Sequence, residues 1–164
     1  NKIGFVPQTI FLTEDTIAEN VAFGIPQDLI DYGQVEKALK LAHLEELVSK
    51  LKNGVYSKVG ERGVQLSGGQ RQRVGIARTL YYEAEVLVFD EATSALDGIT
   101  EKTIMNAIHD FTGQKTLIII AHRLKTVQKC DEIFMMDKGQ IIDAGTYEYL
   151  LQNNEQFKKM SEHA

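Results

Sequence analysis

The sequence predicts an α/β fold in which parallel strands alternate with helices. Two short apolar runs, 86–89 and Thr116–Ile120, have the pattern of strands buried on both faces of a parallel sheet. A helical segment at about 99–111 joins them, and strand–helix–strand alternation is typical of this fold class. A first strand at Ile3–Val6 is separated from the others by a helical zone, about 16–82, which we expect to be an insertion.

The helical zone has one clear helix and one clear break. Apolar residues recur at helical spacing over about 34–51, so a continuous helix is expected there. Gly54, Gly60 and Gly63 indicate a loop, and a further helix is expected at about 70–82.

The end of the chain is expected to be mixed. A short helix is predicted near 124–128, after the second apolar run. Residues 133–136 and 140–143 flank Lys138 and Gly139, a pattern that predicts a hairpin. A polar amphipathic helix is expected from about Thr146.

Composition limits the possible functions. The chain has 164 residues, enough for one domain, and a net charge of -5, which argues against a broad nucleic-acid-binding surface. Its one cysteine, Cys130, excludes an internal disulfide. The longest apolar run, 116–121, is far shorter than the ~20 residues that cross a bilayer, and no leader segment is visible. We expect a soluble cytosolic chain, cut from a longer protein because it begins at Asn1 rather than Met.

The stretch Leu-Ser-Gly-Gly-Gln begins at Leu66 and leads into a helix. The amides of Gly68 and Gly69 at the helix N-terminus, together with the Ser67 hydroxyl, are suited to bind an anion. A glycine-containing turn that only starts the helix explains the same residues.

Polar side chains follow the predicted strands. Asp90 and Glu91 come directly after the first apolar run, where open α/β sheets bind ligands. One carboxylate is suited to hold Mg²⁺ and its neighbour to activate a water molecule. His122 leaves the same predicted edge, and Gln8, after the first strand, can touch a metal or water. The alternatives are an acidic helix cap, a structural histidine and a solvated glutamine.

Together these motifs resemble the ABC ATPase family in their order and spacing. The matches are the glutamine loop at Gln8, the signature at 66–70, the Walker B strand at 86–90 with Glu91, the D-loop from Ser94 to Asp97, and the switch histidine His122. The resemblance covers essentially the whole chain. Asp97 taken alone is equally consistent with a helix cap.

The resemblance implies a partial RecA-like P-loop NTPase core, a parallel sheet flanked by helices, with an inserted α-helical signature subdomain. Residues 1–164 then form the C-terminal portion of an ABC ATPase domain. Within it, 1–8 are the first core strand and glutamine loop, 9–82 the α-helical subdomain, and 83–164 the rest of the core.

The resemblance also implies roles in binding and hydrolysing ATP with Mg²⁺. Asp90 helps to hold the metal through its water shell, and Glu91 is the general base. His122 contacts the γ-phosphate. Gln8 senses metal and water and relays movement to a membrane domain.

Further implied roles concern a second nucleotide-binding domain. The family works as head-to-tail dimers, so Ser67, Gly68, Gly69 and Gln70 contact the ATP held by the opposite subunit. Asp97 lies at the dimer seam.

Several features resemble the exporter branch of the family. The segment that begins at Val59 and ends at Gly63 is similar to the loop through which exporters of this family contact the coupling helices of the membrane domain. The segments 71–73 and 91–94 also resemble those of exporters. The implied function is an ATPase that powers export or lipid flipping at the cytoplasmic face of a membrane, with a bacterial inner membrane expected. Its transmembrane domain would lie upstream on the same polypeptide and be contacted through the Gln8 loop and 59–63.

The chain departs from the family in one respect, because it has no Gly-x-x-x-x-Gly-Lys-Ser/Thr phosphate loop. We therefore expect the chain alone neither to bind ATP tightly nor to hydrolyse it, and to be marginally stable or to pair its strand edges with another copy. The alternative functions are a soluble ABC ATPase of DNA repair or translation, and a non-catalytic dimerisation module.

Overall fold

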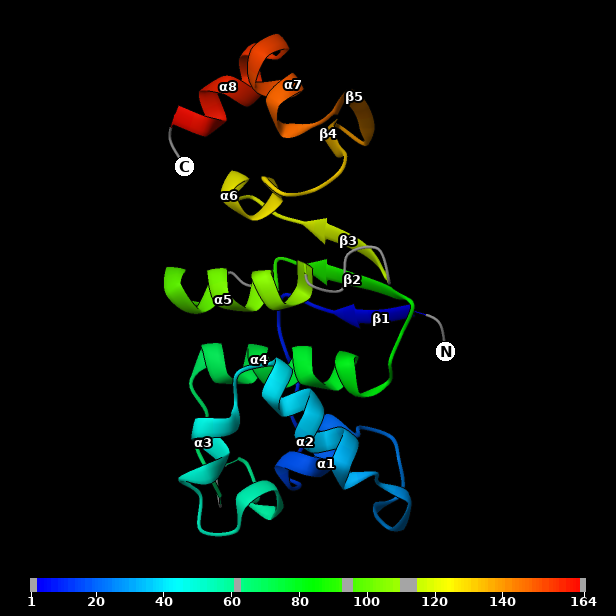
Figure 1. Ribbon diagram of the computed structural model, residues 1–164, viewed down its shortest axis with the longest axis vertical. Coiled ribbons are helices and arrows are strands. Elements are labelled where there is room, and N and C mark those ends of the chain that lie inside the picture. Colours follow the sequence, from blue (N-terminus) through cyan, green and yellow to red (C-terminus); the bar gives the residue numbers. More distant parts are fainter. Residues whose placement is uncertain (1–2, 61–62, 93–95, 110–114, 163–164) are drawn as a thin grey trace. The chain divides into compact units, whose positions relative to one another are not determined.

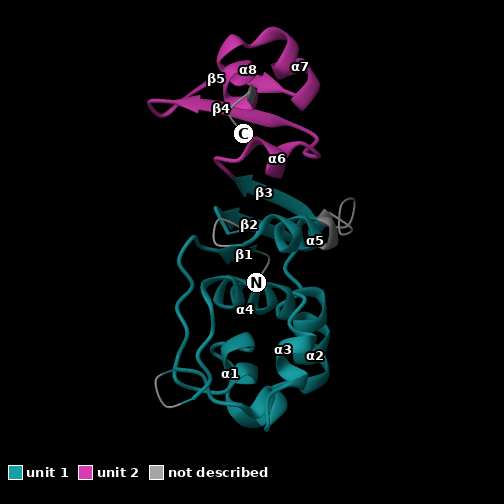
Figure 2. Cartoon of the chain, turned by 90° about the vertical axis from the view of Figure 1, so that its left-hand side faces the viewer, with its two compact units in different colours: residues 1–120 teal, residues 121–164 magenta. Residues whose placement is uncertain are grey.

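The computed structural model describes residues 3–60, 63–92, 96–109 and 115–162 (Figure 1). The chain forms two compact units, residues 1–120 and 121–164 (Figure 2). Each unit has its own arrangement of helices and strands.

The first unit is built on a three-stranded parallel sheet, as predicted. Its strands are β1 (Ile3–Val6), β2 (Val86–Asp90) and β3 (Thr116–Ile120), in the order β1-β2-β3. Val6 lies opposite Phe89, and Phe89 lies opposite Ile119. All three strands therefore run in the same direction and end at one edge.

One face of this sheet is buried and the other is exposed. Val6, Leu87 and Phe89 are buried in the main core, together with residues of the flanking helices. The opposite face carries exposed apolar side chains: Ile3 (65%), Phe5 (55%), Ile118 (48%) and Ile120 (50%). Successive strand residues point to opposite faces. The expectation of burial on both faces is therefore wrong for Thr116–Ile120, whereas the residues of 86–89 are buried or half-buried.

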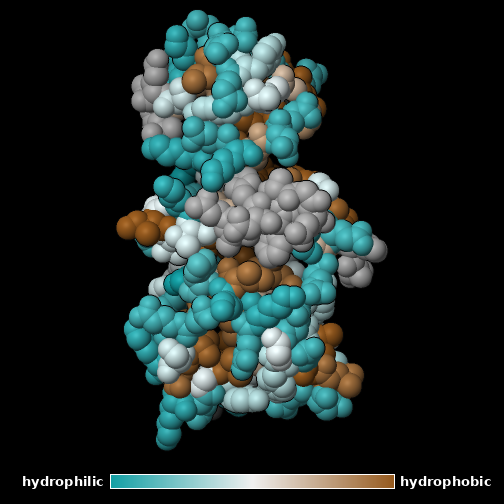
Figure 3. Space-filling model, viewed as in Figure 1, coloured by the Kyte–Doolittle hydropathy of each residue, from teal (hydrophilic) through white to brown (hydrophobic). Residues whose placement is uncertain are grey.

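The residues between β1 and β2 form a helical insertion, also as predicted. It contains helices α1 (Ile17–Val21), α2 (Tyr32–Leu41), α3 (Glu45–Ser49) and α4 (Gly68–Tyr81), and the 3-10 turns Gln27–Leu29 and Gly54–Tyr56. Large hydrophobic side chains also reach the surface of this unit, as the brown areas of Figure 3 show on one face.

The single helix predicted over 34–51 is wrong, because the chain breaks between α2 and α3. His43 adopts a left-handed conformation, with φ 53°. Its amide donates to the Lys40 carbonyl at 3.0 Å, and the Leu44 amide donates to the Leu39 carbonyl at 2.9 Å. This pair of bonds is a Schellman motif, which usually has glycine at the position of His43. The sequence therefore has no glycine at this position to mark the end of α2.

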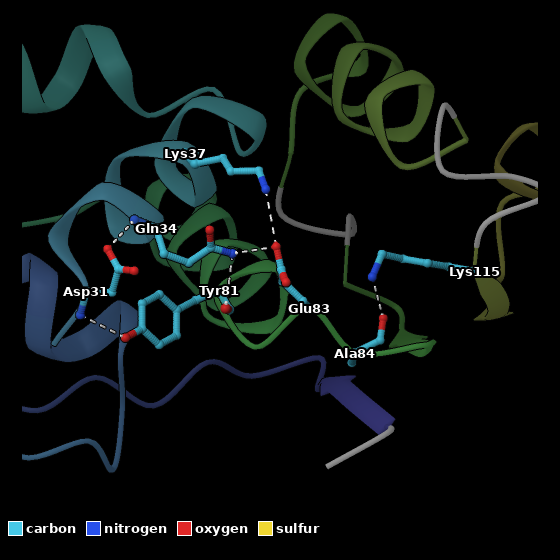
Figure 4. Close-up of polar contacts among 7 residues, drawn as sticks. All are labelled: Asp31, Gln34, Lys37, Tyr81, Glu83, Ala84 and Lys115. Carbon is cyan, nitrogen blue, oxygen red and sulfur yellow. Dashed lines mark hydrogen bonds and ion pairs between the residues drawn. The ribbon is translucent and has the colours of Figure 1, made fainter. Parts of the chain in front are cut away.

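Polar contacts attach α2 to the turn that joins α4 to β2 (Figure 4). Glu83, in a left-handed conformation at φ 49°, accepts hydrogen bonds from Gln34 Nε2 at 3.1 Å and Lys37 Nζ at 3.2 Å. The Tyr81 hydroxyl accepts a bond from the amide of Asp31 at 3.2 Å. These contacts hold α2 beside the end of α4.

Helix α5 (Gly98–His109) connects β2 to β3 in the first unit. Ile104 and Ile108 from this helix are buried in the same core as Leu87 and Phe89. The part of the predicted helix beyond residue 109 lies outside the described residues.

The second unit contains α6 (Leu124–Val127), the antiparallel hairpin of β4 (Ile133–Asp137) and β5 (Gln140–Gly145), then α7 (Tyr147–Asn153) and α8 (Glu155–Glu162). The hairpin confirms the prediction, but the single final helix is wrong. Asn154 has an extended backbone and separates two helices. Its Nδ2 donates to Asp143 Oδ2 at 2.7 Å, and its Oδ1 accepts from the Phe157 amide at 2.9 Å, which caps α8.

No helix within the described residues is both long enough and apolar enough to span a bilayer.

Candidate functional site

The ends of β1 and β2 bring Gln8 and Glu91 together. Gln8 follows β1 after Pro7, and Glu91 directly follows β2. Gln8 Nε2 donates a hydrogen bond to Glu91 Oε2 at 2.8 Å, although the two residues are 83 positions apart. The contact lies at the carboxyl ends of parallel strands, where open α/β sheets bind ligands.

The backbone of Glu91 is held in an unusual conformation. Its φ is 46°, in the left-handed region that non-glycine residues rarely adopt. Its amide donates to the carbonyl oxygen of Ile120, at the end of β3, at 3.0 Å. A tertiary contact therefore fixes the strained residue, and such strain often occurs at functional sites.

Asp90 is the last residue of β2 and lies opposite Ile120 in the sheet register. It therefore stands beside Glu91 at the same sheet edge. His122 lies two residues beyond the end of β3, in the second unit.

The signature residues start α4. Ser67 Oγ accepts a hydrogen bond from the Gln70 amide at 3.2 Å, and Gln70 Oε1 accepts one from the Ser67 amide at 2.8 Å. This reciprocal pair is a capping box. The Ser67 hydroxyl is the acceptor here, so its own hydrogen is available for donation. The amides of Gly68 and Gly69 come first in the helix and have no acceptor within it.

Asp97 caps helix α5. Its Oδ1 accepts hydrogen bonds from the amides of Ile99 at 3.2 Å and Thr100 at 3.0 Å. Hydrogen bonds from the side chain and backbone of Thr100 lower the pKa of the Asp97 carboxyl below its usual range. The helix-cap alternative thus describes this residue in the structure. Of the other D-loop residues, Leu96 is buried in the core of the first unit. Ser94 and Ala95 lie outside the described residues.

The segment that begins at Val59 and ends at Gly63 is part of a tight loop. The Val59 amide donates to the Asp15 carbonyl at 3.0 Å, and the Val64 amide donates to the Lys58 carbonyl at 2.8 Å. A Cβ on Gly63 would lie 2.2 Å from the Lys58 carbonyl oxygen, so only glycine fits there. Residues 61–62 lie outside the described residues.

Gln72 is a residue whose contact the sequence motifs did not predict. Its side chain, on α4, is only 3% exposed, and its Nε2 donates to the Gln8 carbonyl oxygen at 3.4 Å. The signal available in the sequence was a polar residue on a helix face that otherwise packs into the core.

The oxygen donors at the sheet edge suit a metal whose other ligands are water molecules and phosphate oxygens. Asp90 and Glu91 supply carboxylates, and Gln8 retains its side-chain oxygen because its nitrogen makes the bond to Glu91. Among the described residues, no group of three or more His, Cys, Asp or Glu side chains forms a protein cage for a metal. Mg²⁺ typically takes one or two carboxylates, with waters and phosphate oxygens completing its shell, so this donor set fits it.

A family model described as "ABC transporter" matches residues 1–94 of the chain. Among curated relatives, the ATP-dependent lipid A-core flippase of Cupriavidus pinatubonensis is 44% identical over 155 residues, which cover 94% of this chain and 26% of the flippase. The flippase of the same name from Vibrio parahaemolyticus is 45% identical over 153 residues, or 93% of this chain and 26% of that protein. The chain thus spans about a quarter of the length of these relatives.

A solved structure of a bacterial Atm1-family ABC exporter with ATP bound matches the fold with a TM-score of 0.90 at 38% sequence identity. The match covers 99% of this chain and 28% of the exporter chain. The predicted fold class, a partial parallel sheet flanked by helices with an α-helical insertion, is confirmed. By its motifs, its fold and these matches, the chain belongs to the ABC transporter family.

Proposed function

We propose that this chain is part of the ATP-hydrolysing portion of an ABC exporter that moves lipids across a bacterial inner membrane. The relatives named as lipid A-core flippases support a lipid cargo, and the match to an exporter structure supports the direction of transport. The hydrogen bond between Gln8 and Glu91 is the observation that carries the proposal. It joins two residues expected to handle the attacking water at one sheet edge.

In the proposed mechanism, Glu91 accepts a proton from the water that attacks the γ-phosphate. Gln8 orients this water, since its amide already lies 2.8 Å from the Glu91 carboxylate. Asp90 and Gln8 would hold Mg²⁺, Asp90 through its water shell, and the metal would supply positive charge beside the phosphate oxygens. His122 contacts the γ-phosphate.

We further propose that the start of α4 binds the ATP held by a second nucleotide-binding domain in a head-to-tail dimer. Gly68 and Gly69 present helix N-terminal amides, and Ser67 adds a hydroxyl donor. Gln70, whose own amide donates to Ser67 Oγ, lies beside them and completes the proposed contact. Asp97 lies at the dimer seam in this proposal, in addition to capping α5.

The proposed membrane partner is a transmembrane domain at the cytoplasmic face of the membrane. It is contacted by the loop that contains Gln8 and by the segment from Val59 to Gly63. The tight hydrogen bonding around Lys58 and Val64 supports the second contact, because it gives this segment a fixed base.

The proposal is tested with the full-length protein in lipid vesicles by measuring phosphate release from MgATP. Replacing Glu91 with Gln keeps the shape but removes the base, so we expect the rate to fall by about 100–1,000-fold while ATP binding changes less than about threefold. Glu148→Gln, on the exposed surface of α7, is the matched control and should keep the parental rate. The 164-residue chain alone, which has no phosphate loop, should release none. Parental hydrolysis by the Glu91→Gln variant would refute the proposed role.

A further inference from the structure

The segment from Gly4 to Gln8 runs along one side of α4. Gly4 packs so closely on the helix that an added Cβ would lie 2.4 Å from Thr79 Cγ2. At the other end of the segment, the Gln8 carbonyl oxygen accepts the 3.4 Å hydrogen bond from Gln72. The chain bends at Gln8.

After the bend, the chain returns along the same helix. Ile10 is buried against Gly75, where an added Cβ would lie 2.4 Å from Ile10 Cδ1 and 2.8 Å from Cγ1. Arg78 Nη2 donates to the Phe11 carbonyl oxygen at 3.1 Å. Both limbs of the bend are therefore attached to α4.

The four helix residues that make these contacts, Gln72, Gly75, Arg78 and Thr79, form what we call the clamp stripe. Gln72 lies three residues before Gly75, and Arg78 and Thr79 lie three and four residues after it, so all of them neighbour Gly75 on the same side of α4. Gln72, Thr79 and Ile10 are buried, whereas the bond from Arg78 to the Phe11 carbonyl lies at the surface. The glycine is required sterically, because any larger residue displaces Ile10.

We propose that the clamp stripe positions Gln8 on Glu91, so that Gly75 and its partner Ile10 act as positioning residues for ATP hydrolysis. Gly75 touches neither Gln8 nor Glu91 in this role and acts through the backbone of the bend. The stripe begins two residues after the signature motif on the same helix. A shift of α4 when the signature meets a nucleotide therefore moves the bend, and Gln8 with it. This inference rests on the proposed ATPase function.

The test uses four variants of the full-length protein in lipid vesicles: Gly75→Ala, Ile10→Ala, the double variant, and Gly33→Ala. Gly75→Ala forces Ile10 out of its place, whereas Ile10→Ala removes the contact without a clash. The double variant restores room for the added methyl group. Gly33→Ala is the matched control, because Gly33 is also helical and its added Cβ meets only Asp31 Oδ1, at 3.3 Å.

We expect Gly75→Ala to lower kcat about tenfold and Ile10→Ala about threefold, with KM for MgATP within about twofold of the parent in both. The double variant should recover to the kcat of Ile10→Ala, since the clash is gone. Gly33→Ala should keep the parental kcat. Amide hydrogen exchange over residues 8–12, measured without nucleotide, should be faster in Gly75→Ala than in the parent or in Gly33→Ala.

A parental kcat in both Gly75→Ala and Ile10→Ala, with Glu91→Gln inactive, would overturn the clamp and leave the proposed function intact. A double variant as slow as Gly75→Ala would also overturn it, because the defect would then not pass through Ile10. If Gly75→Ala does not fold, the kcat of Ile10→Ala tests the clamp, and a parental kcat in that variant would refute it. The hydrogen-exchange measurement tests the clamp even if the Glu91→Gln result shows that the proposed function is wrong. An unchanged exchange rate over residues 8–12 in Gly75→Ala would refute the clamp.

Discussion

A single buried amide, that of Asn20, organises the turn that follows the Gln8 segment. Its side chain is fully buried at the end of α1. Asn20 Oδ1 accepts from the Thr13 amide at 2.9 Å, and Nδ2 donates to the carbonyl oxygens of Thr13 at 3.1 Å and Thr16 at 3.0 Å. The side chain thus replaces water for several backbone groups of the turn.

Replacing Asn20 with Leu should open this turn. The shape is nearly kept, but the part-buried amide and carbonyl of Thr13 lose their side-chain partner, at a cost of about 3 kcal/mol. We expect hydrogen-exchange protection over residues 13–16 to fall about a hundredfold. Asn153→Leu is the control, because Asn153 is exposed and its side chain donates to the Tyr149 carbonyl of its own helix. Equal protection in Asn20→Leu and the parent would contradict this role.

The candidate site was predictable at the residues that end strands. Strand order placed Glu91 after one predicted strand and Gln8 after another, and the structure joins the two side chains at 2.8 Å. Pattern reasoning did not separate the two interpretations of Asp97 or Ser67, because a helix cap and a ligand donor require the same side chains. Gln72 was not identified, since its contact depends on how α4 packs on a distant segment.

At the scale of elements, the turn between α4 and β2 depends on a charged contact. The hydrogen bonds from Lys37 and Gln34 lower the pKa of the Glu83 carboxyl below its usual value. A lowered pKa in the folded protein means that the contact stabilises the fold above about pH 4.3, the ordinary glutamate value. This contribution is lost as the pH falls through the lowered pKa.

Glu83→Gln should therefore lower Tm at pH 7 by no more than about 3 °C, because the pair is exposed to solvent. The difference from the parent should shrink as the pH falls below about 4. Thermal melts followed by circular dichroism between pH 3 and pH 7 measure this difference in Tm. Lys37→Met should show the same trend, and the double variant should be no less stable than either single variant. A Tm difference that stays constant down to pH 3 would contradict the assignment to Glu83 ionisation.

Elements with a strong pattern were predicted and those that depend on one unusual residue were not. Strands β1, β2 and β3 and the β4–β5 hairpin follow from apolar runs and from Lys138-Gly139. The break after α2 depends on His43 adopting a conformation that usually requires glycine. The break before α8 depends on the bond from Asn154 to Asp143, which only the folded second unit provides.

At the scale of the whole molecule, the exposed face of the sheet is the main departure from the predicted burial. Ile3 and Phe5 on β1 and Ile118 and Ile120 on β3 lie on this face, and Phe5 and Ile118 are in register on either side of Val88. Parallel sheets are normally covered on both faces. Among the described residues, β1 and β3 each pair with a neighbour on one side only. An apolar face and unpaired edges both favour association with other chains.

The 164-residue chain alone should therefore self-associate in solution. We expect light scattering at about 0.1 mM to give a mass above one chain, with a broad or irreversible melt. The double variant Phe5→Asp with Ile118→Asp should raise the monomer fraction, because both side chains are about half exposed and carry the apolar face. Leu29→Asp is the control, since Leu29 is 67% exposed but lies in the 3-10 turn Gln27–Leu29, away from the sheet. A monodisperse parental monomer with one cooperative melt would show that neither the sheet face nor its edges drive association.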